Sequence, residues 1–210
     1  MAALLDEFTA IVSVLNEAEI KYAVCGGMAM AIHGFMRTNL YIEFLVSPEA
    51  SCKFETIAIK LGYEIDLTPS RYLKSTFGFT RYSKVDQGAG EPIGIHVYLV
   101  TEELSETWNE RELFATANHD LTVVSKNGLV FMMRNSGRAQ EEIDVDNVPE
   151  SCDMSPDGVL GRIRRMNELW ELSVALMRAG KGPRKTLPLP ERLWERSLAD
   201  RIPWLNDWQK

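Results

Sequence analysis

Residues 25–46 read CGGMAMAIHGFMRTNLYIEFLV, and this stretch decides the fold. It begins at the end of a short apolar run, YAVC at 22–25, which is typical of a buried strand. The Ala and Met content of residues 28–33 favours a helix, and Gly34 suits its C-terminal cap. The alternating segment YIEFLV at 41–46 is typical of a second strand. A strand, a Gly-Gly turn, a helix and a strand are therefore predicted in succession.

Two features of this stretch bear on chemistry. The strand places Tyr41 and Glu43 on one face, and the other face carries the apolar side chains Ile42, Phe44 and Val46. Gly26 and Gly27 come directly before the helix, where free backbone N–H groups attract anions such as phosphate. The same glycine pair also fits an ordinary turn, so the residues alone leave both interpretations open.

The rest of the chain continues the alternation of helices and strands. Further helices are predicted at 2–18, 48–61 and 102–115, and strands at 63–85 (one or two), 93–100 and 121–125. Helices dominate afterwards, at 127–135, 138–147 and 156–179. This order predicts an α+β (or α/β) fold with a mixed sheet flanked by helices and a helical C-terminal part. We expect a domain at 1–150, a long helix packed on it at 151–180, and a basic, proline-rich linker with a tryptophan-containing tail at 181–210.

The composition is that of an ordinary globular chain. Of the 210 residues, 45% are apolar and 25% charged, which excludes a collagen-like, disordered or disulfide-built protein. The three widely spaced cysteines are interpreted as reduced thiols. The N-terminus carries acids where a signal peptide carries bases, and no apolar run approaches the length of a membrane span. We therefore expect a cytoplasmic protein without a membrane partner.

Charge is distributed unevenly along the chain. The net charge is −7, yet residues 181–210 hold seven Lys and Arg against four Asp and Glu. The acidic body predicts no general DNA binding, because phosphate contacts supply most non-specific affinity. Bases and aromatic residues interleave between Arg71 and Lys84, Arg81 among them. Such a pattern fits a nucleotide or single-strand groove, or strands that alternate core aromatics with solvated charges.

Two other charged stretches are interpreted as solvated helix faces. Six acids and no base lie within residues 139–153, and Arg138 precedes them at a spacing that would pair it with Glu142. The sequence RIRR at 162–165 lies opposite the apolar stripe of the long C-terminal helix.

These motifs resemble the nucleotidyltransferase superfamily, which has the DNA polymerase β type of fold. The resemblance rests on Gly26-Gly27, His33-Gly34, Arg37 and the strand at 41–46, in that order. It points to the branch of minimal nucleotidyltransferases and abortive-infection toxin-like proteins. The segment VVSKNGLVFMMRNSGRAQEEIDVDNV at 123–148 is similar to the family's later segment, with its Ser-Gly-Arg and acidic helix.

The resemblance implies a site and its cofactors. Gly26 and Gly27 would cradle the phosphates of a nucleoside triphosphate, and Arg37 would bind phosphate charge or else lie at the surface. Glu43 would be the catalytic, metal-binding carboxylate for Mg²⁺ or Mn²⁺. The family has Asp-Ile-Asp where this chain has Tyr41-Ile42-Glu43, and the position of the third carboxylate is matched by His96. One carboxylate of the three remains.

This departure leaves two hypotheses open. The first is an enzyme that transfers a nucleoside monophosphate from the triphosphate to a hydroxyl of protein or RNA, as in a toxin–antitoxin system. The second is a catalytically impaired nucleotide-binding or protein-interaction module, a pseudoenzyme on the same fold. Tyr41 and His96 would line the nucleotide in either case; His96 also fits a buried, hydrogen-bonded core histidine. The tail's tryptophans, Trp194, Trp204 and Trp208, would pack on the body or join a homo-oligomer.

Overall fold

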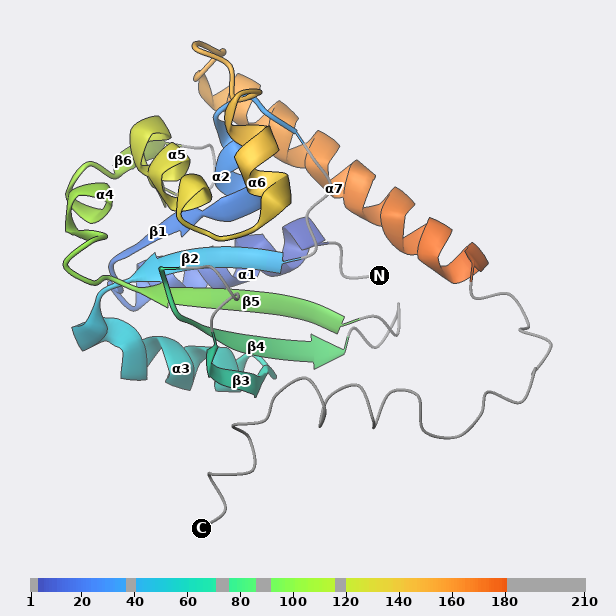
Figure 1. Ribbon diagram of the computed structural model, residues 1–210. Coiled ribbons are helices and arrows are strands. Elements are labelled where there is room, and N and C mark those ends of the chain that lie inside the picture. Colours follow the sequence, from blue (N-terminus) through green and yellow to red (C-terminus); the bar gives the residue numbers. More distant parts are fainter. Residues whose placement is uncertain (1–3, 37–40, 71–75, 86–91, 116–119, 181–210) are drawn as a thin grey trace, which may run out of the picture. The chain divides into compact units, whose positions relative to one another are not determined.

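The computed structural model describes residues 4–36, 41–70, 76–85, 92–115 and 120–180 (Figure 1). Arg37, Arg71 and the tail at 181–210 lie outside the described residues. Contacts between Cα atoms divide the chain into two units, Met1–Ala175 and Leu176–Lys210. The sheet, its helices and the candidate site all belong to the first unit.

The described strands form one seven-stranded mixed sheet in the order β3-β4-β5-β2-β1-β7-β6. Within the sheet, β1 lies between β2, to which it is antiparallel, and β7, to which it is parallel. The bounds are β1 Tyr22–Cys25, β2 Tyr41–Val46, β3 Glu64–Ser70, β4 Phe79–Val85, β5 Pro92–Leu99, β6 Glu112–Ala115 and β7 Asp120–Val123. The predicted mixed sheet flanked by helices is confirmed.

The helices cover both faces of this sheet (Figure 1). Phe44 of β2 stacks on Phe8 of α1 and contacts Phe54 of α3, so these two helices cover one face. The short helix α2 and helices α5 and α6 lie over the other. The bounds are α1 Leu4–Glu17, α2 Gly26–Ile32, η1 Pro48–Ala50, α3 Ser51–Lys60, α4 Ser105–Asn109, α5 Lys126–Arg134, α6 Ala139–Val145 and α7 Pro156–Gly180. None of the described helices combines the length and apolar character that a membrane crossing requires.

The predicted helix at 102–115 is wrong in its second half. Helix α4 ends at Asn109, and Glu112–Ala115 form the edge strand β6. Leu113 lies opposite Thr122 of β7 in an antiparallel ladder. Pairing with β7 satisfies the backbone of this segment within the sheet, and tertiary pairing of this kind overrides local helix propensity.

Helix α7 reaches across to α1 and α2 through polar side chains. Ser155 caps its start, with Oγ accepting a hydrogen bond from the Gly158 N–H at 3.2 Å. Arg162 Nη2 donates to the carbonyl oxygen of Ile32 at 2.8 Å, and Nε donates to that of Ala31 at 3.0 Å. The expectation that RIRR is solvated is therefore wrong for Arg162, because its guanidinium binds carbonyls at the end of α2, where the helix itself leaves acceptors free for further donors.

Candidate functional site

The start of α2 and the middle of β2 meet at Gly26 and Glu43. Gly26 follows β1 directly and adopts φ +59°, in the left-handed region that favours glycine. A Cβ at this position would lie 1.7 Å from Oε2 of Glu43, so the carboxylate occupies the space that glycine leaves. The Gly27 N–H donates to the same Oε2 at 3.1 Å. The two predicted elements thus converge, with the Glu43 carboxylate itself against the glycine turn.

The other carboxylate oxygen of Glu43 is surrounded by donors. Oε1 accepts a hydrogen bond from the Tyr98 hydroxyl at 3.3 Å and lies 3.4 Å from Nη2 of Arg138. His96 Nδ1 is 3.7 Å from Oε1, beyond hydrogen-bond length. The Glu43 side chain is only 1% exposed. Both oxygens of this buried charge are therefore paired within the protein.

This environment keeps Glu43 ionised. Burial alone would raise its pKa, but the neighbouring His96 ring, the Arg138 guanidinium and the Gly27 N–H together lower the pKa of Glu43 to about 2. The carboxylate carries its charge across the physiological range, and it shares the guanidinium of Arg138 with the buried Glu141.

A second group of side chains occupies the position of the expected other carboxylates. Tyr41 and His96 stack with ring centroids 4.2 Å apart. Arg81 of β4 donates from Nε to His96 Nε2 at 3.2 Å and from Nη2 to the Tyr41 hydroxyl at 3.3 Å. Because arginine only donates, His96 Nε2 accepts, which places the ring proton on Nδ1, facing Glu43.

Sheet register brings these side chains into one line. Arg81 pairs with His96, His96 with Glu43, and Glu43 with Cys25, across β4, β5, β2 and β1. We call Arg81, His96, Glu43 and the overlying Arg138 the charged row. Two acids flank it: Asp66 lies 3.6 Å from Arg81, and Glu141 forms an ion pair with Arg138.

The charged row does not fit a divalent metal. Mg²⁺ requires several oxygen ligands in octahedral geometry, and Mn²⁺ likewise favours oxygen donors. Glu43 is the one carboxylate of the charged row, and its oxygens already face three donors. Glu141 lines the same cavity but is paired with Arg138. Within the described parts of the chain, no group of three or more His, Cys, Asp and Glu is arranged to hold a metal ion.

A small cavity of about 20 Å³ lies above Glu43, which is room for about one water molecule. Gly26, Tyr98, Ser136 and Arg138 are among its lining residues. Cys25 also lines it, but burial raises the pKa of this thiol well above its usual value, so Cys25 is not a thiolate nucleophile.

The acidic segment after Arg138 is solvated only in part. Asp146, Glu150 and Asp153 are exposed as predicted, whereas Glu141 and Asp144 are buried, and Glu141 pairs with Arg138. The side chain of Glu142, the predicted partner, lies outside the described residues. The physical reason is that α6 packs on α5, which turns this acidic face toward the site.

Sequence reasoning missed two members of the site, Arg138 and Tyr98. Arg138 was expected to pair along its own helix, and Tyr98 was not singled out, although the strand at 93–100 put it on the same face as His96. Arg81 was named among the bases of a possible nucleotide groove, but its place beside His96 follows only from the register between β4 and β5.

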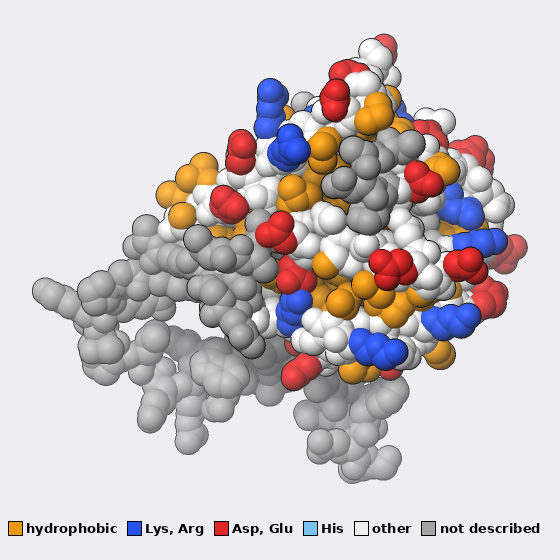
Figure 2. All heavy atoms as spheres, turned by 180° about the vertical axis from the view of Figure 1, so that it is seen from behind, with side chains coloured by type: hydrophobic (Ala, Val, Ile, Leu, Met, Phe, Trp, Pro, Cys, Tyr) orange, Lys and Arg blue, Asp and Glu red, His pale blue; other side chains and the backbone are white. Residues whose placement is uncertain are grey.

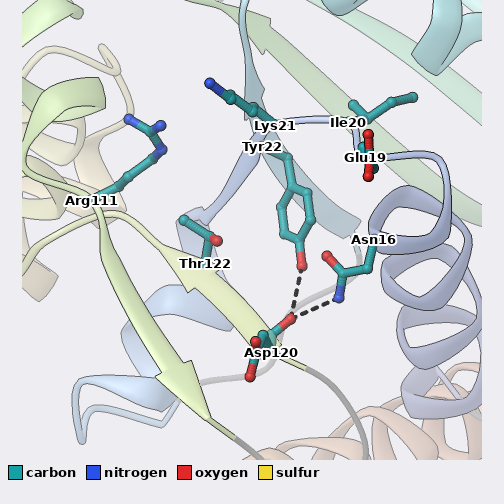
Figure 3. A pocket seen from close by; sticks show the side chains of 8 residues that line it. All are labelled: Asn16, Glu19, Ile20, Lys21, Tyr22, Arg111, Asp120 and Thr122. Atoms are coloured by element: carbon teal, nitrogen blue, oxygen red, sulfur yellow. Dashed lines mark hydrogen bonds between the residues drawn. The ribbon is translucent and has the colours of Figure 1, made fainter.

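A larger hollow of about 490 Å³ lies elsewhere, at the start of β1 (Figure 3). In Figure 3, Asn16 and Tyr22 point toward Asp120, whose backbone oxygen accepts hydrogen bonds from Asn16 at 2.8 Å and Tyr22 at 3.4 Å. Lys21 and Arg111 also line it. None of the predicted site residues that the structure describes lines this hollow, and neither does any member of the charged row. On the face seen in Figure 2, the described acidic and basic side chains are interspersed among apolar ones.

A scan against protein-family models and a search of curated proteins both find no match. The chain is similar in fold to the lincosamide antibiotic adenylyltransferase LnuA with bound lincomycin (13% identity, 70% of this chain, 96% of that chain, TM-score 0.47). It is also similar to a putative nucleotidyltransferase from Thermotoga maritima (15% identity, 68% of this chain, 90% of that chain, TM-score 0.47). A third similar structure is an antigenic nucleotidyltransferase-like protein from Paracoccidioides brasiliensis (13% identity, 83% of this chain, 92% of that chain, TM-score 0.46).

Proposed function

We propose that this protein is a nucleotide-binding module with a nucleotidyltransferase-like fold and without metal-dependent transfer activity. The observation that carries the proposal is the pairing of Glu43. Its two oxygens accept from the Gly27 N–H, the Tyr98 hydroxyl and the Arg138 guanidinium, all within 3.4 Å. In this arrangement Glu43 holds the start of α2, β5 and the start of α6 together, which is a structural role.

The chemistry of transfer explains why this matters. Moving a nucleoside monophosphate from a triphosphate builds up charge on the phosphate oxygens, and metal ions held by carboxylates normally neutralise it. A single carboxylate already balanced by Arg138 is a poor anchor for such an ion. We therefore assign no metal-dependent step to Glu43.

The same pocket supports binding of a phosphate group. The Arg138 side chain is a quarter exposed, whereas its two partners Glu43 and Glu141 are buried, so Arg138 is the charged side chain of this group that solvent reaches most. Guanidinium groups recognise phosphate oxygens through paired hydrogen bonds. Because the cavity has room for about one water molecule, the phosphate would bind at its mouth against Arg138, and the base and sugar of the nucleotide would lie farther out.

Metal-dependent transfer to a hydroxyl of protein or RNA is the competing function. The convergence of Glu43 on the Gly26-Gly27 turn favours it, since this is the placement that the family resemblance implies. It would require Glu43 to leave Arg138 and bind a metal instead. The expected acceptor, toxin–antitoxin partner, cytoplasmic location and homo-oligomer through the tail stay predictions.

One experiment separates these functions. The full chain is incubated with labelled ATP, CTP, GTP or UTP, with Mg²⁺ or Mn²⁺, and both bound nucleotide and label attached to protein or added RNA are measured. The same assays are made on Glu43→Gln and on the double variant Tyr41→Asp, His96→Asp, which restores carboxylates at the two replaced positions.

We expect the natural chain to bind at least one nucleotide without attaching its label to any acceptor. Label transfer that Glu43→Gln abolishes would overturn the proposal in favour of the enzyme. Absence of binding to all four nucleotides would overturn nucleotide binding itself. A gain of transfer in the double variant would show that the missing carboxylates are what prevents the reaction.

A further inference from the structure

We infer that Arg81 and Arg138 take the place of divalent metal ions and form a metal-independent site for the phosphate groups of the nucleotide. This inference rests on the proposed nucleotide binding and names the residues and the ionic requirement of that site. The charged row does not fit a metal ion. Tyr41 and His96, which stand where the family has carboxylates, both accept hydrogen bonds from Arg81, and the remaining carboxylate, Glu43, accepts from Arg138.

Arg81 is fixed at its inner side by uncharged groups. Its Nε and Nη2 atoms donate to His96 and Tyr41, and its guanidinium lies 5.0 Å from the centre of the Tyr41 ring. Three contacts hold the planar group in one orientation, which reduces the entropy lost when it binds an anion. The described anion closest to it is Asp66, at 3.6 Å.

The link between Arg81 and Asp66 is one that a ligand can replace. The Asp66 side chain is 47% exposed, and an ion pair this exposed contributes little to stability. The Arg81 side chain is 25% exposed, so a phosphate arriving from solvent can reach the guanidinium and displace the carboxylate. A phosphate carries more charge and more acceptor oxygens than Asp66 does.

Arg138 stands at the other end of the row. It is positioned by two acids, Glu43 at 3.4 Å and Glu141, and its side chain is also 25% exposed. Both acids are buried, so neither leaves to solvent easily. They fix Arg138 over the cavity, while Arg81 places a second guanidinium on the same face of the sheet, on β4.

The presence of Tyr41 and His96 in place of carboxylates changes whether the site needs metal ions to bind phosphate. Three carboxylates at positions 41, 43 and 96 would repel a triphosphate until metal ions neutralised them. A phenol at 41 and an imidazole at 96 remove two of those charges, and the arginines then supply the cations. Phosphate binding at this row therefore needs no metal.

The test compares binding with and without metal. Affinities of the full chain for ATP and for inorganic tripolyphosphate are measured by calorimetry, once in EDTA and once in Mg²⁺. The variants are Arg81→Gln, Arg138→Lys, which keeps the charge and loses the fork, and Asp66→Asn, which removes the competing anion. Arg164→Gln, at an exposed position of α7, is the matched control.

We expect the affinity for ATP to be the same in EDTA and Mg²⁺ within about twofold. Arg81→Gln and Arg138→Lys should each weaken it at least about tenfold, Asp66→Asn should strengthen it, and Arg164→Gln should not change it. If tripolyphosphate competes with ATP for binding, the charged row recognises the phosphate groups themselves. If tripolyphosphate does not compete, the assignment of the row as a phosphate site is overturned.

Other outcomes separate the two proposals. Binding that EDTA abolishes, or that Arg81→Gln leaves intact, overturns the arginine site while nucleotide binding stands. Absence of ATP binding in both buffers overturns the arginine site for ATP, and absence of binding to CTP, GTP and UTP as well overturns the proposed function. Thermal unfolding of each variant distinguishes a lost contact from a lost fold.

Discussion

Gly26 has no room for a side chain, because the carboxylate of Glu43 occupies the space where a Cβ atom would lie. We predict that Gly26→Ala lowers the free energy of unfolding by about 3 kcal/mol. The new Cβ would meet Oε2 of Glu43 at 1.7 Å, and the φ of +59° adds strain for any residue with a Cβ. Urea denaturation of the two proteins measures the difference.

Gly62→Ala is the matched control for this prediction. Gly62 also has a positive φ, +86°, but nothing lies within 4 Å of the Cβ it would gain. Its cost should be that of the backbone alone, about 1 kcal/mol. Equal losses in both variants would mean that the contact between Gly26 and Glu43 contributes nothing.

The pairing of Glu43 makes a prediction about acid. Its folded pKa of about 2 lies below the ordinary value of 4.5, so its contribution to stability is present above pH 4.5 and is lost as the pH falls toward 2. The stability difference between the natural chain and Glu43→Gln should therefore shrink over that interval. Denaturation series at several pH values measure it.

An exposed glutamate provides the reference for that series. Glu168 lies on the surface of α7, and Glu168→Gln removes the same charge without removing a buried pair. Its curve should follow that of the natural chain at every pH. A difference for Glu43→Gln that stays constant from pH 4.5 to 2 would contradict the stabilising role of the ionised carboxylate.

At the scale of elements, the start of α5 depends on one side chain. Ser125 Oγ accepts a hydrogen bond from the Gly128 N–H at 3.1 Å, which satisfies a donor that the first turn leaves unpaired. We predict that Ser125→Ala destabilises the protein by about 1 kcal/mol. Ser105→Ala, whose hydroxyl is exposed, should cost less in the same urea titration. Equal losses in the two variants would show that the hydrogen bond from the Gly128 N–H to Ser125 does not stabilise the start of α5.

Elements differ in how far their sequences predict them. Strand β2 followed its alternation, because Phe44 packs under α1 and α3 while Glu43 faces α2. Strand β6 could not be predicted from its own residues, since it exists through pairing with β7. Local periodicity reports which face is apolar, whereas an edge strand is decided by a partner far away in sequence.

The site shows the same division. The approach of Glu43 to Gly26 follows from a strand and a turn that the sequence predicted, and the alignment of His96 with Glu43 agrees with the position that the family resemblance gave it. The positions of the arginines do not follow from the sequence, because Arg81 is placed by the β4–β5 register and Arg138 by the packing of α6 on α5. The missing carboxylates were visible in the sequence, whereas the placement of the cations now beside them was not.

At the scale of the whole molecule, the sheet is covered on both faces, and this buries polar groups that must find partners within the protein. His33, at the end of α2, is 5% exposed, and its Nε2 lies 2.8 Å from the carbonyl oxygen of Val124. A carbonyl only accepts, so Nε2 carries the proton. Burial lowers the pKa of His33 below 6.5, more than the bond to Val124 raises it.

This histidine should make the whole fold sensitive to mild acid. Below pH 6.5 the unfolded chain takes up a proton at position 33 that the folded chain resists, so stability is intact above pH 6.5 and falls as the pH drops toward the lowered folded pKa. One proton corresponds to a slope of at most about 1.4 kcal/mol per pH unit. His33→Gln keeps a donor for Val124 and cannot titrate, so its unfolding free energy should lose this slope between pH 6.5 and 5. A slope that persists in His33→Gln would place the acid sensitivity in another group.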